Sequence, residues 1–408
     1  MIRALRIAQV APPLERVPPE AYGGTERIVF ELVAELTRRG HDVTTFASGD
    51  SLVPGTLVPT VPRALRPTGH GGDIGGYILA TMLKVLDRQA EFDLIHSHLD
   101  WFGLILRRAA QTPVVSTFHG RLDMPWSRDV FADHPNDLVA ISESQASVHP
   151  DVPWTIVHNG LTLDTAPFER RRTNDLVFVG RVTPEKGIVD AIRIAELADR
   201  PLKIAAKVGP TPAEQEFNER VFEPALKRAH GRVEFLGELS GEDRDALFAR
   251  SYAVLMPGSW PEPFGLVAIE ALACGAPVIA RRVGGLDEII RDGVDGFFGD
   301  DVTEMAFMID RLGTLDREAI RRSVIDRFSA GRMADSYEAL YARLLGLGED
   351  DAAAVRGRRL VEIPARRRER DPVSSGERRT SEPDLAEDGS EAESDGAESA
   401  DPTAATPA

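Results

Sequence analysis

Short apolar stretches alternate with helical patterns along the first 150 residues. Residues 5–11 (LRIAQVA) and 41–48 (HDVTTFAS) have the length and composition of buried strands. Between them, residues 25–40 predict a helix that ends at Gly40 and whose apolar face carries Ile28, Val29, Leu32, Val33 and Leu36. Further strands are expected at 92–98, 112–120 and 137–143. Buried strands that alternate with helices predict a parallel, doubly wound α/β sheet.

The same alternation starts again after a polar, arginine-rich stretch at residues 168–175. Strands are expected at 176–180, 202–209, 232–238, 253–259 and 276–282, and closing helices near 302–312, 316–327 and 330–347. Two Rossmann-like domains joined near 160–172 explain this pattern most economically. We expect an N-terminal domain of residues 1–160 and a C-terminal domain of residues 161–348, whose last helix can cross back to the first domain.

The pattern stops near residue 349. Residues 349–408 are basic at first and then acidic, rich in Ser, Ala and Pro, and almost free of large apolar side chains. Such a composition buries too little apolar area to offset chain entropy, so a disordered charged tail is expected. It is either a solubilising tail or an interaction tail.

The charge distribution argues against two classes of partner. The net charge is −17, and residues 371–408 contribute eleven acidic side chains against two arginines. The remaining chain has no basic stripe with interleaved aromatic residues, which excludes nucleic acid as an expected partner. A stable electrostatic contact with anionic lipid is disfavoured for the same reason.

The chain has a single cysteine, Cys274, so an intramolecular disulfide and a thiolate metal cluster are excluded. Its first residues lack the apolar core of a signal peptide, and no run of about 18 apolar residues is present to span a bilayer. We therefore expect a cytoplasmic protein without stable membrane insertion.

Candidate ligand-binding residues lie at the ends of the predicted strands, where loops and helix N-termini meet in doubly wound sheets. Gly23 and Gly24 precede the first helix and could present backbone N–H groups to a phosphate, although a glycine pair there is also a common turn. His119 ends the strand at 112–120, and His96 and His98 end the strand at 92–98. Each histidine is either structural or directed into the cleft.

The segment VFVGRVTPEKG, residues 177–187, carries a stronger signal. Arg181 and Lys186 share one short loop before a helix, in a chain with only five lysines. Two cations at a helix N-terminus oppose the helix dipole unless an anion joins them. A diphosphate would satisfy both, with a fork from arginine and a point charge from lysine; the alternative is a solvated surface loop.

The segment SWPEPFGLVAIEALACG, residues 259–275, places Glu262 before a helix and Glu270 inside an otherwise apolar run. Each carboxylate alone has a plain explanation, as a helix cap or as a partner of an arginine. An acidic side chain inside a buried helix nevertheless needs a polar partner. The vicinal hydroxyls of a ribose would provide one.

These motifs together resemble the family 4 retaining glycosyltransferases of the GT-B fold, over about residues 5–345. The resemblance rests on the Gly-Gly loop, TFHG, VHNG, VGRVTPEKG, FLGEL, EPFGLVAIEALACGAPVIA and GGLDEIIRDGVDGFF. The most specific part is the pair of glutamates eight positions apart combined with the Arg/Lys loop. The longer sequence segments among these are similar to those of a bacterial subgroup whose members act on varied acceptors.

The resemblance implies a role for each matching residue. Arg181 and Lys186 would grip the diphosphate of a nucleotide-sugar, and Glu270 would bind its ribose. Glu262 would face the donor sugar, a nucleophilic role being the weaker interpretation, and His119 would contact the transferred sugar. The other donor-side positions are Gly23 and Gly24 near the phosphates, Leu236, Gly237 and Glu238 near the base, and Phe264, Gly265 and Leu266 near the sugar and phosphate.

The implied reaction retains the anomeric configuration and needs no metal, because cations and helix N-termini can stabilise the departing diphosphate. No Asp-x-Asp motif stands at a predicted strand end. No cofactor is expected; the donor would be a UDP- or GDP-sugar and the acceptor a small molecule or a glycan. The sequence does not identify the acceptor.

Two other classes of function are open. A sugar-nucleotide epimerase of the same fold would transfer nothing to an acceptor. A non-catalytic sugar-nucleotide-binding protein would act through its acidic tail. The combination of Arg181, Lys186, Glu262 and Glu270 favours the transferase over both.

Overall fold

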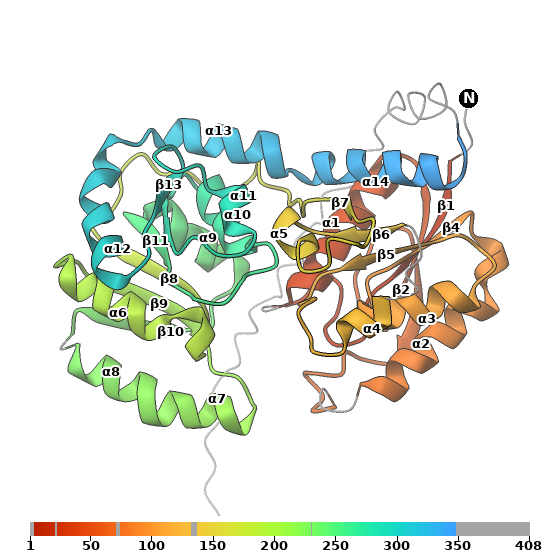
Figure 1. Ribbon diagram of the computed structural model, residues 1–408, viewed down its shortest axis with the longest axis horizontal. Coiled ribbons are helices and arrows are strands. Elements are labelled where there is room, and N and C mark those ends of the chain that lie inside the picture. Colours follow the sequence, from red (N-terminus) through yellow and green to blue (C-terminus); the bar gives the residue numbers. More distant parts are fainter. Residues whose placement is uncertain (1–3, 21–22, 71–73, 132–136, 230, 348–408) are drawn as a thin grey trace, which may run out of the picture. The chain divides into compact units, whose positions relative to one another are not determined.

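Two parallel β-sheets, one from each half of the chain, organise the structure (Figure 1). The computed structural model describes residues 4–20, 23–70, 74–131, 137–229 and 231–347. All of these described residues belong to one compact unit. The predicted disordered tail, residues 349–408, lies outside the described residues.

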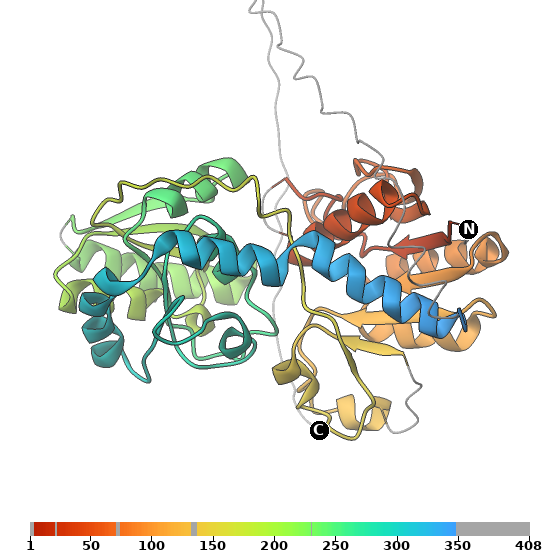
Figure 2. The same cartoon turned by 90° about the horizontal axis from the view of Figure 1, so that it is seen from above.

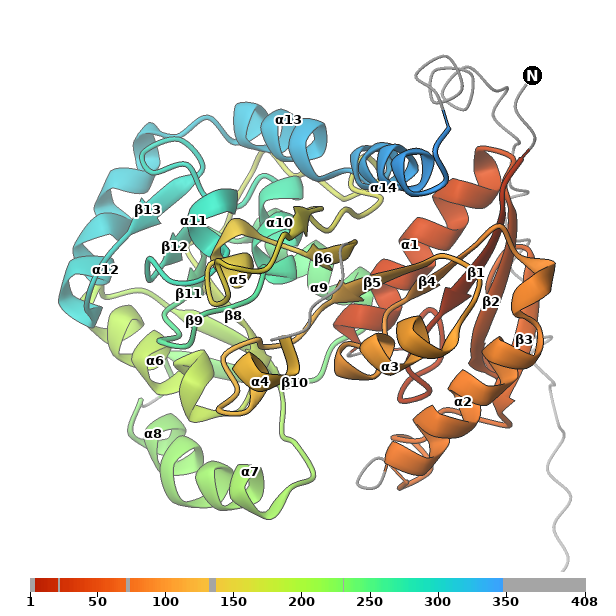
Figure 3. The same cartoon turned by 45° about the vertical axis from the view of Figure 1, so that its right-hand side comes forward.

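The first sheet has the strand order β3-β2-β1-β4-β5-β6-β7. Its strands are β1 (Arg6–Val10), β2 (Asp42–Ser48), β3 (Thr56–Val61), β4 (Leu94–Ser97), β5 (Val114–Phe118), β6 (Leu138–Ala140) and β7 (Thr155–Ile156). Successive side chains point to opposite faces, so Ile7 joins the core under α1 (Gly24–Arg38), while Ala8 joins the core under α2 (Gly75–Asp87) and α3 (Trp101–Ala109). Figure 3 shows these helices on the two sides of the sheet.

The second sheet has the order β10-β9-β8-β11-β12-β13. Its strands are β8 (Leu176–Arg181), β9 (Leu202–Lys207), β10 (Val233–Gly237), β11 (Ala253–Met256), β12 (Val278–Ala280) and β13 (Gly296–Phe298). One face is covered by α6 (Ile188–Leu197), α8 (Glu223–Arg228) and α12 (Val302–Ile309). The other is covered by α9 (Gly241–Arg250), α10 (Leu266–Ala273) and α13 (Arg317–Phe328).

The last described helix, α14 (Ala330–Leu344), packs on the first sheet although it follows the second in sequence (Figure 2). The chain crosses between the halves twice, and the crossings pair with each other: Leu161 N–H donates to Phe328 O at 3.0 Å. A salt bridge between Arg39 and Asp335, at 2.8 Å, fixes α14 to the end of α1. The second crossing therefore returns the chain to the first half, where α14 packs against α1.

Shorter elements join these layers. They are α4 (Ser127–Phe131), α5 (Glu143–Ala146), α7 (Pro212–Phe217), α11 (Leu286–Ile289), the 3₁₀ turns at Gln89–Glu91, Pro184–Lys186 and Asp310–Thr314, and a π-helical turn at Asn218–Phe222. Among the described residues, no helix is long and apolar enough to cross a membrane.

The predicted fold class is confirmed: two Rossmann-like parallel sheets, each covered by helices. Three strands, at 56–61, 155–156 and 296–298, were not predicted from the sequence. The first contains Pro59 and only two buried positions, and the other two span only two or three residues, so none shows a long apolar run. The division into domains at residue 160 stays a prediction.

Strand order reverses once in each sheet, between β1 and β4 in the first and between β8 and β11 in the second. The loops that follow these strands diverge to opposite faces and leave a crevice at the carboxyl edge. The fold thus directs the loops after β1, β4, β8 and β11 to the places where a ligand binds most readily.

Candidate functional site

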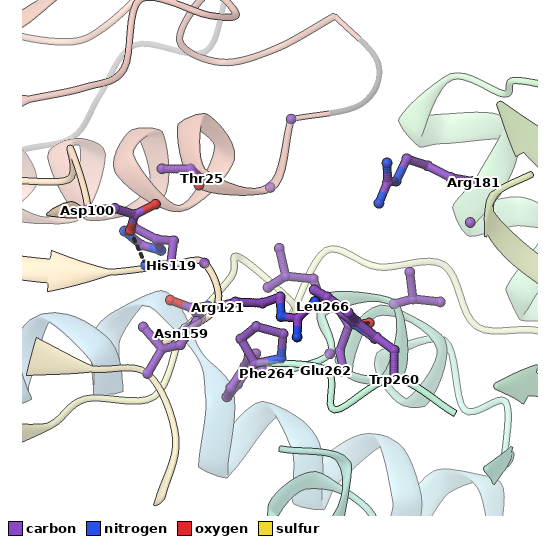
Figure 4. Close-up of a pocket in the computed structure, with 18 of the residues that line it drawn as sticks. Thr25, Asp100, His119, Arg121, Asn159, Arg181, Trp260, Glu262, Phe264 and Leu266 are labelled. Atoms are coloured by element: carbon purple, nitrogen blue, oxygen red, sulfur yellow. Dashed lines mark hydrogen bonds between the residues drawn. The ribbon is translucent and has the colours of Figure 1, made fainter. Parts of the chain in front are cut away.

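A cavity of about 580 Å³ lies between the carboxyl edges of the two sheets (Figure 4). Much of its lining comes from the loops after β1, β4 and β5 on one side and after β8 and β11 on the other. Most of the predicted site residues lie here: Gly23, Gly24, His119, Arg181, Lys186, Glu262, Phe264, Gly265 and Leu266. Four others, Leu236, Gly237, Glu238 and Glu270, are not part of its lining.

The loops after β8 and β11 meet at two glycines. Gly187 has a φ of 72°, and a Cβ added there would lie 2.9 Å from the backbone of Pro257 and Gly258. A side chain is therefore excluded by both conformation and space. This close approach brings Lys186, the neighbour of Gly187, next to the loop that carries Glu262.

Glu262 is held by side chains of both loops. Its Oε2 pairs with the Lys186 ammonium and accepts a hydrogen bond of 3.2 Å from Trp260 Nε1. The Lys186 ammonium also lies 5.7 Å from the centre of the Trp260 ring, a cation–π contact. The carboxylate and the ammonium thus form one preorganised pair in the cavity wall.

Arg181 projects into the cavity from the end of β8 (Figure 4). Its two terminal nitrogens lie 3.2 Å from Glu214 and 3.3 Å from Glu185, and its Nε has no hydrogen-bond partner among the described residues. About a third of the side chain is exposed. An anionic ligand could therefore exchange these contacts for stronger, bidentate ones.

The N-terminus of α10 also faces the cavity, through Phe264, Gly265 and Leu266. Gly265 is the N-cap with a φ of 119°, and no side chain caps the helix. Uncapped N–H groups and the helix dipole favour an anion at this end. This position complements the two cations of the neighbouring loop.

Glu270 lies one turn further along α10, 5% exposed, and lines a separate small cavity of about 60 Å³. It pairs with Arg27 of α1 and with Arg244 of α9, the latter at 3.0 Å. Burial and the nearby Arg244 lower the pKa of Arg27 to about 10. The structure therefore places Glu262 and Glu270 in different cavities, and Glu270 already has the arginine partners that a buried carboxylate requires.

The predicted base-binding loop lies at the end of β10. Glu238 is exposed and pairs with Lys207 at 3.3 Å, and Gly237 adopts a φ of 70°. None of the three residues lies at the large cavity. Their assignment to the base, like that of Glu270 to the ribose, stays a prediction.

On the first sheet, three predicted histidines have different places. His119 and His98 line the cavity and are hydrogen-bonded to each other, His119 Nε2 to His98 Nδ1 at 2.9 Å. His96 is fully buried behind them and does not line the cavity. Burial lowers the pKa of His119 to about 4 and keeps the ring neutral.

Several cavity residues were not predicted from the sequence. Asp100 accepts the backbone N–H of His119 at 2.6 Å, and burial raises its pKa to about 6. Glu26, in the first turn of α1, is 4% exposed, and burial raises its pKa to about 7. Trp260, Arg121 and Asn159 also line the cavity.

A sequence signal exists for only some of them. Asp100 lies in the short loop after β4, at the strand-order reversal, so its position was open to prediction. Arg121 stacks on Trp260, with its guanidinium carbon 4.9 Å from the ring centre. These two residues are distant in sequence, and nothing in their local patterns indicates the contact.

Comparison with known proteins identifies the class that this fold and site define. The description "Glycosyltransferase Family 4" matches residues 22–165, and "Glycosyl transferases group 1" matches residues 164–316. The two matches meet where the chain first crosses between the sheets. The chain belongs to the group 1 glycosyltransferases, and it is a transferase of the EC 2.4 class.

Individual relatives agree with this class. The chain is 30% identical to a D-inositol 3-phosphate glycosyltransferase of Mycobacterium sp. (strain KMS), over 74% of this chain and 81% of that protein. It is 29% identical to a glycogen synthase of Mycobacterium tuberculosis (strain CDC 1551 / Oshkosh), over 68% and 79%. Among solved structures, it is similar to AviGT4, a glycosyltransferase involved in avilamycin A biosynthesis, with a TM-score of 0.64, 25% identity and coverage of 84% and 99%.

Proposed function

We propose that the protein transfers a sugar from a nucleotide-diphosphate-sugar to an acceptor hydroxyl, with retention of anomeric configuration and without a metal ion. One observation carries the proposal. Arg181 and Lys186 reach one cavity from the second sheet, opposite Gly23, Gly24 and His119 of the first. This arrangement offers a diphosphate two cations and offers the attached sugar a polar wall.

The diphosphate is the group that the second sheet is suited to bind. Arg181 can donate two parallel hydrogen bonds from its guanidinium, and Lys186 provides a compact positive charge. The uncapped N-terminus of α10 adds the positive end of its helix dipole. Negative charge grows on the diphosphate as the bond to the anomeric carbon breaks, so these groups stabilise the transition state more than the ground state. They supply the charge that a divalent ion supplies in other transferases.

Retention follows if the acceptor attacks from the side that the diphosphate leaves. The bond between the anomeric carbon and the phosphate oxygen breaks, and a bond to the acceptor oxygen forms on the same face. The acceptor hydroxyl proton passes to the departing phosphate oxygen. Glu262, tied to Lys186 and Trp260, orients the donor sugar and is not the nucleophile.

The donor is a UDP- or GDP-sugar and the acceptor a small molecule or a glycan. One similar protein is named as a D-inositol 3-phosphate glycosyltransferase, and another is a glycosyltransferase involved in avilamycin A biosynthesis. The reaction takes place in the cytoplasm, without nucleic acid and without stable insertion into a membrane. Neither the donor nor the acceptor requires a further cofactor.

A ligand screen tests the proposal. The purified protein is heated with UDP-, GDP- and ADP-sugars, and a bound donor raises the melting temperature by mass action. The best donor is then assayed for nucleoside diphosphate release in the presence of EDTA. Release that rises with an added acceptor supports transfer, and release abolished by EDTA contradicts metal independence.

The sugar-nucleotide epimerase is separated by the same assay. An epimerase converts the donor without a lasting release of nucleoside diphosphate, whether or not an acceptor is present. Conversion of that kind would contradict the transferase proposal.

A further inference from the structure

A chain of hydrogen-bonded side chains links the cavity to the last described helix. His119 Nε2 lies 2.9 Å from His98 Nδ1, and His98 Nε2 lies 2.8 Å from Gln9 Oε1. Gln9 Nε2 then donates to the hydroxyl of Tyr341 in α14 at 3.4 Å. The cavity-facing histidine is therefore connected to a residue more than two hundred positions away in sequence.

A second branch leaves the same tyrosine. The Tyr341 hydroxyl lies 2.7 Å from His96 Nδ1, and His96 Nε2 lies 2.7 Å from Thr117 Oγ1. Thr117 Oγ1 is in turn 3.0 Å from the hydroxyl of Tyr337. Tyr337 thus belongs to the network but contacts neither Gln9 nor His98 through its hydroxyl.

The network excludes solvent. Gln9 and Tyr341 are fully buried, and His98 is 1% exposed. A polar group buried so deeply needs a hydrogen-bond partner, and each of these groups finds one inside the network. Its hydrogen bonds are therefore coupled, since no member can turn without leaving another unsatisfied.

The proton positions along the first branch follow from the amide of Gln9. Its Oε1 can only accept, so His98 Nε2 carries a proton. Burial and the neighbouring His96 lower the pKa of His98 well below its usual value, so the ring is neutral and its Nδ1 is an acceptor. The proton between the two rings therefore belongs to His119 Nε2.

The other nitrogen of His119 is then an acceptor. His119 is neutral as well, so its Nδ1 keeps a lone pair, and Nδ1 has no hydrogen-bond partner among the described residues. The residue lines the cavity. A ligand hydroxyl placed there can donate to His119 Nδ1.

We propose that the hydroxyl of Tyr341, acting through Gln9 and His98, is a positioning group that fixes His119 in the Nε2–H tautomer and leaves Nδ1 to accept a ligand hydroxyl. Tyr341 fixes the direction of the amide because its own proton is directed to His96 Nδ1, which leaves its oxygen to accept from Gln9 Nε2. Without that oxygen the amide can turn over and donate to His98, which moves the shared proton away from His119 Nε2. His119 Nδ1 would then carry a proton and repel a donating hydroxyl.

The tautomer itself does not depend on the reaction, but its use for a sugar hydroxyl rests on the proposed function. Tyr341→Phe removes one oxygen and keeps the ring that packs in the core. Tyr252→Phe is the matched control, because it makes the same change at a buried tyrosine outside the network. Each protein is labelled with ¹⁵N-histidine, and a His119→Gln variant assigns the signals of His119.

The wild-type protein should show His119 as the Nε2–H tautomer at pH 7.5. Tyr341→Phe should shift it toward Nδ1–H and lower donor turnover about fivefold, the typical effect of one hydrogen bond, with the donor KM within about twofold. Tyr252→Phe should leave the tautomer unchanged. An Nδ1–H tautomer in the wild type, or an unchanged tautomer in Tyr341→Phe, overturns the proposal.

The two proposals can fail separately. A wild-type protein that shows the Nε2–H tautomer and its shift in Tyr341→Phe, but turns over no nucleotide-sugar, contradicts the proposed function alone. Normal transfer with an Nδ1–H tautomer contradicts the network proposal alone.

Discussion

For Glu270, the sequence indicates an unusual buried carboxylate but does not indicate the side chains that surround it. The sequence marks it as an acidic side chain in an apolar helix, and the structure adds Arg27 and Arg244 as its partners. Neither arginine is near Glu270 in sequence. The need for a partner could be predicted, but its identity could not, because it comes from two other helices.

These contacts predict a loss of stability in Glu270→Gln. The substitution leaves two largely buried guanidinium groups facing a neutral amide, which should lower the free energy of unfolding by about 3 kcal/mol. Urea unfolding measures the change. Glu223→Gln, which removes an exposed carboxylate paired with Lys227, is the control and should change stability by less than about 0.5 kcal/mol. A stability equal to that of the wild type would contradict the structural role, and donor affinity in the folded variant tests the ribose separately.

The neutral state of His119 predicts a pH dependence. Its folded pKa of about 4 lies below the ordinary 6.5, so between these values the unfolded chain binds the additional proton. The stabilisation contributed by the neutral ring is fully present above pH 6.5 and is lost as the pH falls toward 4. As the pH falls over this range, the unfolding free energy of the wild type should therefore decrease relative to that of His119→Gln.

At the scale of elements, the loop between β8 and α6 depends on one glycine. Gly187 combines a left-handed backbone with a 2.9 Å approach to the loop after β11. Gly187→Ala should cost about 1–3 kcal/mol of stability and lower turnover, because the displaced loop carries Lys186. Gly313→Ala is the control, since its Cβ would meet open space. Equal melting temperatures for the two variants would show that the close approach does not matter.

The elements that alternate clearly in sequence were the ones that could be predicted. Strands with long apolar runs, such as β1 and β8, and the amphipathic α1 were located within a few residues. The missed strands lack a long apolar run in sequence: β3 contains Pro59 and two exposed positions, and β7 and β13 span only two or three residues. Candidate residues next to long strands, such as Arg181 and His119, could be placed at the cavity, whereas Trp260 and Asn159 depend on how the two sheets meet.

For the whole molecule, the composition predicts that the acidic segment 371–408 does not contribute to the core. A chain that ends at residue 370 should keep the melting temperature and the donor affinity of the full-length protein, because almost no apolar area is lost. Calorimetry of the two chains measures both quantities. A large decrease of either would show that the segment packs on the remainder of the chain.

The central claim is that Arg181 and Lys186 hold a nucleotide-sugar diphosphate in the cavity between the sheets. Steady-state transfer with the best donor from the thermal screen tests it most directly. Arg181→Ala and Lys186→Ala should each lower turnover by about 10²-fold or more through lost charge stabilisation. Lys227→Ala, which removes a largely exposed lysine of the same half, should leave turnover unchanged. Near-normal turnover in both Arg181→Ala and Lys186→Ala would contradict the account.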